Sequence, residues 1–318
     1  TWQTNALTVS PNGSEKIGGT NADVVLNTRG QSVTFVYVDS TQGWINTMDS
    51  TSNERGNAFI VATGGTVTCC GNYKIHTFTG PGTFTVSGTA VCAADNKIDY
   101  LVVAGGGSGG TANGGFGGGA GGAGGFRSSN DTCMSAPLTS PLANPTGVTV
   151  TATAFPITVG AGGAAFSSPN VSNGNNGNPS TFSTITSTAG GYGGGGTSPC
   201  HSPGGPGGSG GGGWGDSPTA AAGGNGNTPP VSPPQGNNGG TSSPGASGYG
   251  GGGGGGGGAV GGNTGNPGGS GGGGKGGDGG TDPGTAGTAN TGGGGGGSRA
   301  GTTGAGGSGI VIIRYKYQ

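Results

Sequence analysis

Charged residues are scarce in this chain of 318 residues: they make up 7% of it, and 12 of the 21 lie in the first hundred positions. The formal net charge is −1 and no basic cluster occurs, so the electrostatic attraction needed for nucleic acids or anionic membranes is missing. No apolar run approaches the roughly 20 residues of a membrane-spanning helix. We therefore expect neither nucleic-acid binding nor membrane insertion.

Catalytic patterns are missing as well. GxGxxG matches carry no information about dinucleotide binding where glycine is so frequent, and the P-loop pattern fails at Gly276, where Ser or Thr is required. Cys200 and His201 are adjacent in an extended stretch, so their side chains point apart, and no orienting carboxylate is nearby. The sequence predicts no enzyme and no cofactor.

The five cysteines show none of the CxxC spacing of zinc sites, and the only histidines are His76 and His201, so no metal site is expected. A disulfide from Cys69 or Cys70 to Cys92 is compatible with an extracellular setting. The odd number of cysteines leaves one thiol unpaired within a single chain.

Hydrophobic residues amount to only 28% of the chain, so a conventional core can cover only part of it. Residues 1 to about 103 have no helical periodicity and consist of short β-branched and aromatic runs between turns. The clearest run, Val33–Val38, is followed by the turn-rich DSTQG and by Trp44, which predicts a hairpin. The other expected strands are Leu7–Val9, Val24–Leu26, Phe59–Val61, Lys74–Phe78 and Thr83–Val86.

Two further strands bracket the glycine-rich part of the chain. Ile98–Val103 runs directly into glycine, and Ile310–Tyr315 follows directly on glycine about 200 residues later. We expect both to belong to one small β-platform, with strands near residues 74–103 and 309–315. The sequence thus predicts two domains, a β-rich module over residues 1–64 and the platform with the glycine-rich region over residues 65–318.

Glycine is what the chain has in abundance: 78 of the 90 glycines follow Leu101, and nine form the unbroken row Gly250–Gly258. A content this high is typical of disordered, low-complexity chains, so a flexible linker is one interpretation. Collagen is excluded because it needs glycine at every third position with the other two filled. The third interpretation is a bundle of threefold extended helices of the polyglycine-II type, joined laterally by backbone hydrogen bonds.

The residues that interrupt the glycine runs favour the bundle. In a threefold helix, residues i and i+3 share an edge, so side chains at that spacing are expected where the edge faces water, and inward edges must be glycine. This spacing occurs in Ala120, Ala123 and Phe126, in Pro203, Pro206 and Ser209, and in Lys275, Asp278 and Thr281, whereas Phe116 and Trp214 break phase.

At about 3.1 Å per residue, Gly250–Gly258 would form a rod of about 28 Å in the interior of such a bundle. The expected fold class is therefore all-β plus a polyglycine-II bundle, without α-helix.

Four segments suggest a family: KIHTFTGPGTFTVSG (Lys74–Gly88), IDYLVVAGGGSGG (Ile98–Gly110), ITVGAGG (Ile157–Gly163) and GAGGSGIVIIRY (Gly304–Tyr315). Together they resemble the glycine-rich domain at the ends of tailed-phage and related virion fibre proteins. Residues Asn12–Thr47 are similar to a β-rich module of phage fibre and tail proteins, whose segments often form intertwined trimeric stems.

The resemblance implies a homotrimeric virion fibre protein, exposed on the virion surface with other fibre or tail proteins as partners. It also implies attachment to a host-cell receptor, a protein or a glycan, through the connectors between glycine helices at the distal end. Connectors on the platform side would be excluded. The candidate contact residues are Phe126, Arg127, Tyr192, His201, Trp214 and Tyr249, although an aromatic beside a glycine rod more often seals the bundle.

A second hypothesis is a secreted glycine-rich structural or ice-binding protein. An ice-binding face would need a regular array of small residues, often Thr or Ala, along exposed edges. The sequence offers scattered instances such as Thr288 and Thr291.

Overall fold

The computed structural model describes residues 6–28, 32–49, 57, 59–90, 92–112, 117–132, 140–167, 171–196, 202–214, 220–242, 251–262, 268–277, 283–299 and 301–318. The described chain is all-β, as expected, with one short 3₁₀ turn, η1 (Ala93–Asp95). Among these residues, no helix is long and apolar enough to cross a membrane.

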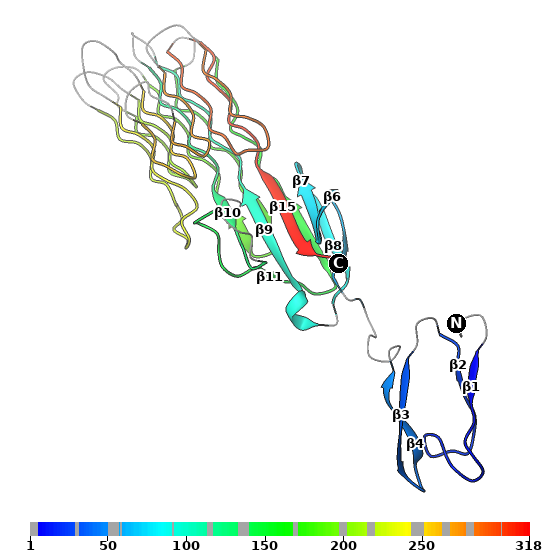
Figure 1. The fold of residues 1–318 in the computed structure, drawn as a ribbon. Helices are drawn as coiled ribbons and strands as arrows, with labels where there is room; N and C mark the ends of the chain where they lie inside the picture. The colour runs from blue at the N-terminus through cyan, green and yellow to red at the C-terminus, as the bar shows by residue number, and fades with distance from the viewer. Residues whose placement is uncertain are drawn as a thin grey trace.

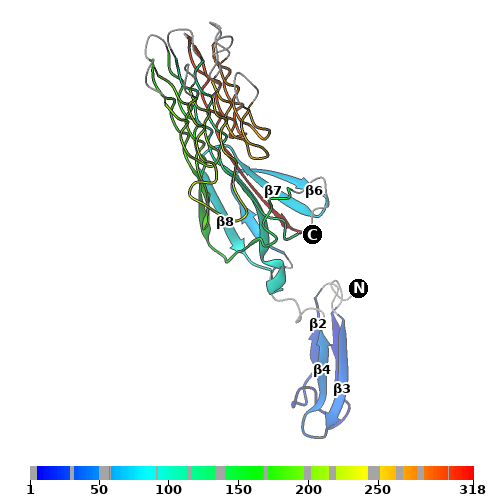
Figure 2. The same ribbon diagram turned by 90° about the vertical axis from the view of Figure 1, so that its left-hand side faces the viewer.

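The N-terminal segment contains two small two-stranded sheets (Figures 1 and 2). β1 (Leu7–Val9) pairs with β2 (Val24–Leu26), and β3 (Val33–Asp39) forms the predicted hairpin with β4 (Gly43–Asp49). The turn between β3 and β4 is held by Asp39, whose carboxylate accepts hydrogen bonds from the backbone N–H groups of Thr41 and Gln42.

Two larger sheets pack face to face and form the part of the molecule that we call the sandwich. One sheet has the order β10-β9-β15-β7-β6, with β11 also pairing with β9, and the other has the order β14-β13-β12-β8-β5. The strands are β5 (Val61–Thr63), β6 (Thr66–Cys70), β7 (Tyr73–Phe78), β8 (Gly82–Gly88), β9 (Lys97–Val103), β10 (Phe126–Ser128), β11 (Val148–Thr149), β12 (Ala154–Thr158), β13 (Ser180–Phe182), β14 (Ile185–Ser187) and β15 (Ile310–Lys316).

The bracketing strands β9 and β15 are antiparallel neighbours, with Ile310 opposite Val103 and Arg314 opposite Asp99. This confirms the prediction that they share a platform. β5 precedes the domain boundary expected at residue 64 but pairs with β8, so residues 61–63 belong to the sandwich.

The core of the sandwich follows from strand alternation. In β15, Val311, Ile313 and Tyr315 are fully buried, whereas the residues between them face outward. They meet apolar side chains of the second sheet, among them Phe84 and Phe182. The sequence pattern IVIIRY therefore codes for one buried and one half-exposed face.

His76 lies at the centre of this core and is fully buried. Its Nδ1 is 2.7 Å from the carbonyl oxygen of Gly64, which only accepts hydrogen bonds, so Nδ1 carries the proton. Its Nε2 then accepts from the Tyr315 hydroxyl, 3.1 Å away. Burial lowers the pKa of His76, the hydrogen bond to Gly64 opposes this, and the positive charge of Lys74 lowers it further.

The glycine-rich bundle, defined as the described residues of 104–125, 160–178 and 188–309, extends from the ends of the sandwich strands (Figure 1). Residues 104–112 continue β9, residues 117–125 lead into β10, and residues 301–309 lead into β15. Because the strands are hydrogen-bonded neighbours, the segments that continue them start side by side.

Backbone N–H groups along residues 104–112 bond to three neighbouring segments in rotation. Gly107 donates to the carbonyl of Gly122, Ser108 to Asn175 and Gly109 to Gly304, and then Gly110 returns to the first neighbour at Gly119. Carbonyl groups of the same segment accept from three others, for example from Gly190, Gly163 and Gly295. The segment is thus bonded to six neighbours, with a period of three residues.

Side-chain positions in the bundle correct the expectation that residues at three-residue spacing face water. Pro203 and Pro206 are exposed, as the three-residue rule predicts, but Ala120, Ala123 and Ser209 are buried. The spacing identifies a shared edge, and whether that edge faces water depends on which segments surround it.

The glycine row does not form one rod. Gly251–Gly256 are buried, whereas Gly257 is half-buried and Gly258 is exposed. The chain reverses there, with the N–H of Gly256 bonded to the carbonyl of Ala259. Gly250 lies outside the described residues.

Two positions in this row test the packing directly. A Cβ built on Gly254 would overlap the carbonyl oxygen of Gly121, whereas one built on Gly257 would meet nothing closer than 3.7 Å. We expect Gly254→Ala to destabilise the bundle by about 1–3 kcal/mol or more and Gly257→Ala to be nearly neutral. Urea unfolding of both variants measures this, and equal midpoints would contradict the interior packing.

Because the folded state lowers the pKa of His76, it disfavours the protonated ring. The stability contributed by neutral His76 is complete above the unfolded-state pKa of about 6.5 and falls as the pH drops below it. We expect the urea midpoint of the wild type to decrease more steeply between pH 7 and pH 5 than that of His76→Gln, which has no titrating ring. Parallel pH profiles would show that His76 does not cause the loss.

Candidate functional site

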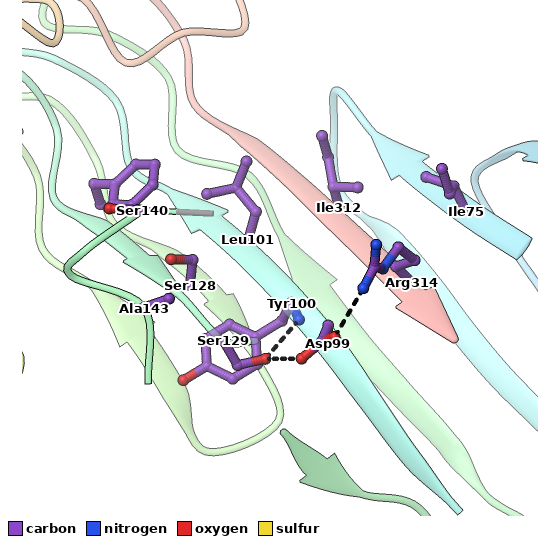
Figure 3. A pocket seen from close by; sticks show the side chains of 11 residues that line it. Ile75, Asp99, Tyr100, Leu101, Ser128, Ser129, Ser140, Ala143, Ile312 and Arg314 are labelled. Carbon is purple, nitrogen blue, oxygen red and sulfur yellow. Dashed lines mark hydrogen bonds and ion pairs between the residues drawn. The ribbon is translucent and has the colours of Figure 1, made fainter. Parts of the chain in front are cut away.

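A hollow of about 210 Å³ lies on the outer face of the six-stranded sheet, where the sandwich meets the bundle (Figure 3). Its floor is apolar and consists of Leu101 on β9, Ile312 on β15 and Ile75 on β7. These residues occupy the outward positions of strands whose inward positions form the core. Ser140 and Ala143, from the loop that follows β10, line another side.

An ion pair stands at the edge of this hollow. Arg314 Nη2 lies 3.3 Å from Asp99 Oδ2, and both side chains are largely buried. The guanidinium carbon of Arg314 also lies 4.4 Å from the centre of the Tyr73 ring. Because Asp99 and Arg314 are opposite one another in the β9–β15 register, the ion pair joins the two strands that bracket the bundle.

Both carboxylate oxygens of Asp99 accept hydrogen bonds. Oδ1 accepts from the Ser129 hydroxyl and the Asp131 N–H, at 2.8 and 2.7 Å, and Oδ2 accepts from the N–H and hydroxyl of Thr132. Burial alone would raise the pKa of Asp99, but these hydrogen bonds outweigh it and hold the pKa below its usual value. A carboxylate held in this way serves the structure and is a poor general base.

A second hollow, of about 380 Å³, shares Phe126 and Ser140 with the first. It extends from Leu142 to the glycine turns at Gly258 and Gly271. The candidate residue Phe126 therefore lies at the root of the bundle. Its neighbour Arg127 is there too, and Arg127 Nη1 donates to the carbonyl of Thr186 on β14, 3.4 Å away.

The predicted contact residues that the structure describes do not form one site. Phe126 and Arg127 lie on the sandwich side, where a distal contact is excluded. Trp214 is at the opposite end, and its backbone N–H donates to the carbonyl of Ser202. It is completely buried, so it offers no ring to a receptor and instead seals the bundle. Tyr192 is half-buried, with its ring against Gly205, and His201 and Tyr249 lie outside the described residues.

The expected disulfide is not formed: Cys69, Cys70 and Cys92 are free and exposed. Cys69 and Cys70 end the edge strand β6, whereas Cys92 lies before η1 and β9, and β9 is separated from β6 by β15 and β7. Cys133 and Cys200 lie outside the described residues.

Sequence reasoning missed two groups of functional side chains. Asp99 and Arg314 each interrupt an apolar bracketing strand, a signal for a charge pair between them. Asn173 and Asn176 also have a purpose: their side-chain oxygens accept from the N–H groups of Gly195 and Tyr192, at 2.8 and 2.9 Å. Their spacing of three residues matches that of the donors.

The described residues contain no group of three or more His, Cys, Asp or Glu side chains placed to hold a metal ion. Comparison with known protein families matches residues 77–316 to the glycine-rich domain family. The chain belongs to this family. The matched residues include the sandwich strands from the end of β7 to β15 and the whole bundle. No curated protein matches the chain.

Replacing Asp99 tests the ion pair. Asp99→Asn would leave Arg314 buried without a counter-charge and would set an amide donor against the Thr132 and Arg314 donors. We expect a loss of about 3 kcal/mol in the free energy of unfolding. Lys97→Gln is the control, because its ion pair with Asp131 is more exposed and contributes no more than about 1 kcal/mol. Similar losses in both variants would contradict the structural role of Asp99.

Proposed function

We propose that the chain is a structural virion fibre protein, from a phage tail fibre or a related appendage, on the virion surface. Its glycine-rich region is a polyglycine-II-type bundle that forms a stiff tip. The connectors at the end of the bundle away from the sandwich attach to a host-cell receptor. No catalytic step belongs to this function.

The proposal is carried by the hydrogen bonds of residues 104–112, whose successive backbone N–H groups donate to three neighbouring segments in turn. A helix with three residues per turn directs successive N–H groups about 120° apart, so residues i and i+3 bond to the same neighbour. Gly107 and Gly110 both donate to residues 117–125, and Ser108 and Thr111 both donate to residues 171–178. Such cross-linking resists bending, which suits a projecting tip.

The N-terminal segment supports the proposed homotrimer. Isolated two-stranded sheets are marginally stable in water, and the described residues of 6–49 bury only two hydrophobic side chains, Ile17 and Leu26. Val36 on β3 is 45% exposed, and its cross-strand partner Ile45 lies on the same face. A neighbouring copy would cover this aliphatic face.

The receptor contact belongs at the distal end of the bundle. Residue 112 is the last described residue of the segment that leaves β9, and it bridges to Gly196. His201 lies in the connector between Gly196 and Ser202, and the N–H of Trp214 bonds to Ser202 at the same end. His201 and Tyr249, both in connectors, are the contact residues that we propose.

One observation favours the second candidate, a secreted ice-binding or structural protein. Short side chains are exposed or half-buried on three neighbouring segments: Thr285 and Thr288, Thr302 and Ala305, and Ala161 and Ala164. The segments are joined through the bonds of Gly284 to Thr302 and of Gly306 to Gly163. A thermal-hysteresis assay separates this candidate from the first.

We expect the purified chain to have three times the monomer mass of 29.3 kDa and to bind bacterial cells or their surface extract. The double variant His201→Ala/Tyr249→Ala should lose at least about tenfold in cell binding, the scale of lost hot-spot residues. Asn225→Ala, on the exposed side of the bundle, should not. Absence of cell binding, or clear thermal hysteresis, would contradict the attachment function.

A further inference from the structure

Two aromatic side chains of the N-terminal hairpin form an exposed corner. Tyr37 on β3 and Trp44 on β4 are cross-strand partners, so they lie on the same face of the hairpin. Their ring centres are 5.6 Å apart and the ring planes are inclined by 67°. Tyr37 is 47% exposed and Trp44 is 37% exposed, so both rings present surface to solvent.

Trp44 is held rigidly in spite of this exposure. Its N–H donates to the carbonyl of Lys16, and its carbonyl accepts from the N–H of Gly18, both at 2.8 Å. Its indole Nε1 donates to Oε2 of Glu15 at 3.0 Å. Gly43 makes this close approach possible: its φ is +71°, and any Cβ there would overlap the carbonyl of Lys16.

A carboxylate, that of Glu15, lies beside the indole ring. The Glu15 residue is exposed, and its carboxylate accepts hydrogen bonds from ligand hydroxyl groups as well as from the indole. The side-chain amide of Asn21 donates to the carbonyls of Gly13 and Glu15 and so holds the loop that carries Glu15. The corner thus combines two exposed aromatic rings, of which Trp44 is held by hydrogen bonds, with one anionic acceptor on a braced loop.

This combination restricts the ligand. A flat molecule with apolar C–H groups on one face fits against a ring, and hydroxyl groups at its rim donate to the carboxylate. Phosphates and nucleic acids would be repelled by Glu15. A purely apolar partner would bury the Glu15 carboxylate without compensation, which is costly. Pyranose sugars have both required features.

We propose that Tyr37, Trp44 and Glu15 form a binding site for uncharged pyranose saccharides. The site lies on the opposite face of the hairpin from Val36 and Ile45, which leaves that aliphatic face to subunit contacts. This inference is independent of the proposed attachment through the distal connectors, because it uses no residue of the bundle.

The test is a titration of the full chain with methyl β-D-glucopyranoside, followed by NMR on the indole N–H of Trp44. We expect saturable shifts with a dissociation constant on the order of 1 mM, the scale of a small ligand on an open surface. Tyr37→Ser should weaken binding at least about tenfold, the scale of a lost aromatic anchor. Val260→Ala, at a 58% exposed position of the bundle, is the control and should bind as the wild type does.

The charge of Glu15 provides a second readout. Methyl β-D-glucuronide, which carries a carboxylate, should bind the wild type more weakly than the glucoside. Glu15→Gln keeps an acceptor for Trp44 but removes the charge, so it should bring the two affinities together. Unsaturable shifts, equal affinities of the wild type for the two sugars, or a Tyr37→Ser variant that changes only the oligomer mass would overturn the proposal.

Discussion

Each backbone group in the interior of the bundle depends on another segment for its hydrogen bond. Along residues 104–112 the N–H groups bond outward to three segments in turn, and the carbonyls accept from three others. A segment of this kind has no bonds within itself, so it gains nothing by ordering alone. It also has no room for a side chain where a carbonyl oxygen of the next segment fills the space that a Cβ would take, as at Gly107 and Gly121.

This dependence explains why the sandwich exists beside the bundle. Glycine loses more conformational freedom on ordering than any other residue, so the segments need a template that places their ends in register. β9, β15 and β10 are hydrogen-bonded neighbours, and each continues directly into a bundle segment. The Asp99–Arg314 pair joins β9 to β15 at the far side of this template, and the core around His76 holds the two sheets together.

The surface of the bundle satisfies the same requirement in other ways. Where a segment has no neighbour on its outer side, side chains replace the missing backbone partners, as Asn173 and Asn176 do for the donors at Gly195 and Tyr192. Proline occupies exposed positions such as 203 and 206, where it has no N–H to leave unsatisfied. The N-terminal hairpin, by contrast, exposes aliphatic groups on one face and aromatic groups on the other.

Local pattern was sufficient to predict the all-β class, the β3–β4 hairpin and the pairing of the two bracketing strands, because alternation and turn residues act over a few positions.

The three-residue spacing in the glycine runs was also visible in the sequence. It could not show that Ala120 and Ala123 face other segments while Pro203 and Pro206 face water. Nor could it show that Trp214 is buried, that the chain reverses at Gly257, or that Cys69, Cys70 and Cys92 stay free. These properties depend on which segments lie beside one another, and segments that are nearly all glycine carry no side-chain code for their neighbours. The sequence by itself determined where extended, side-chain-free backbone is possible, and only the tertiary structure decided which backbone it meets.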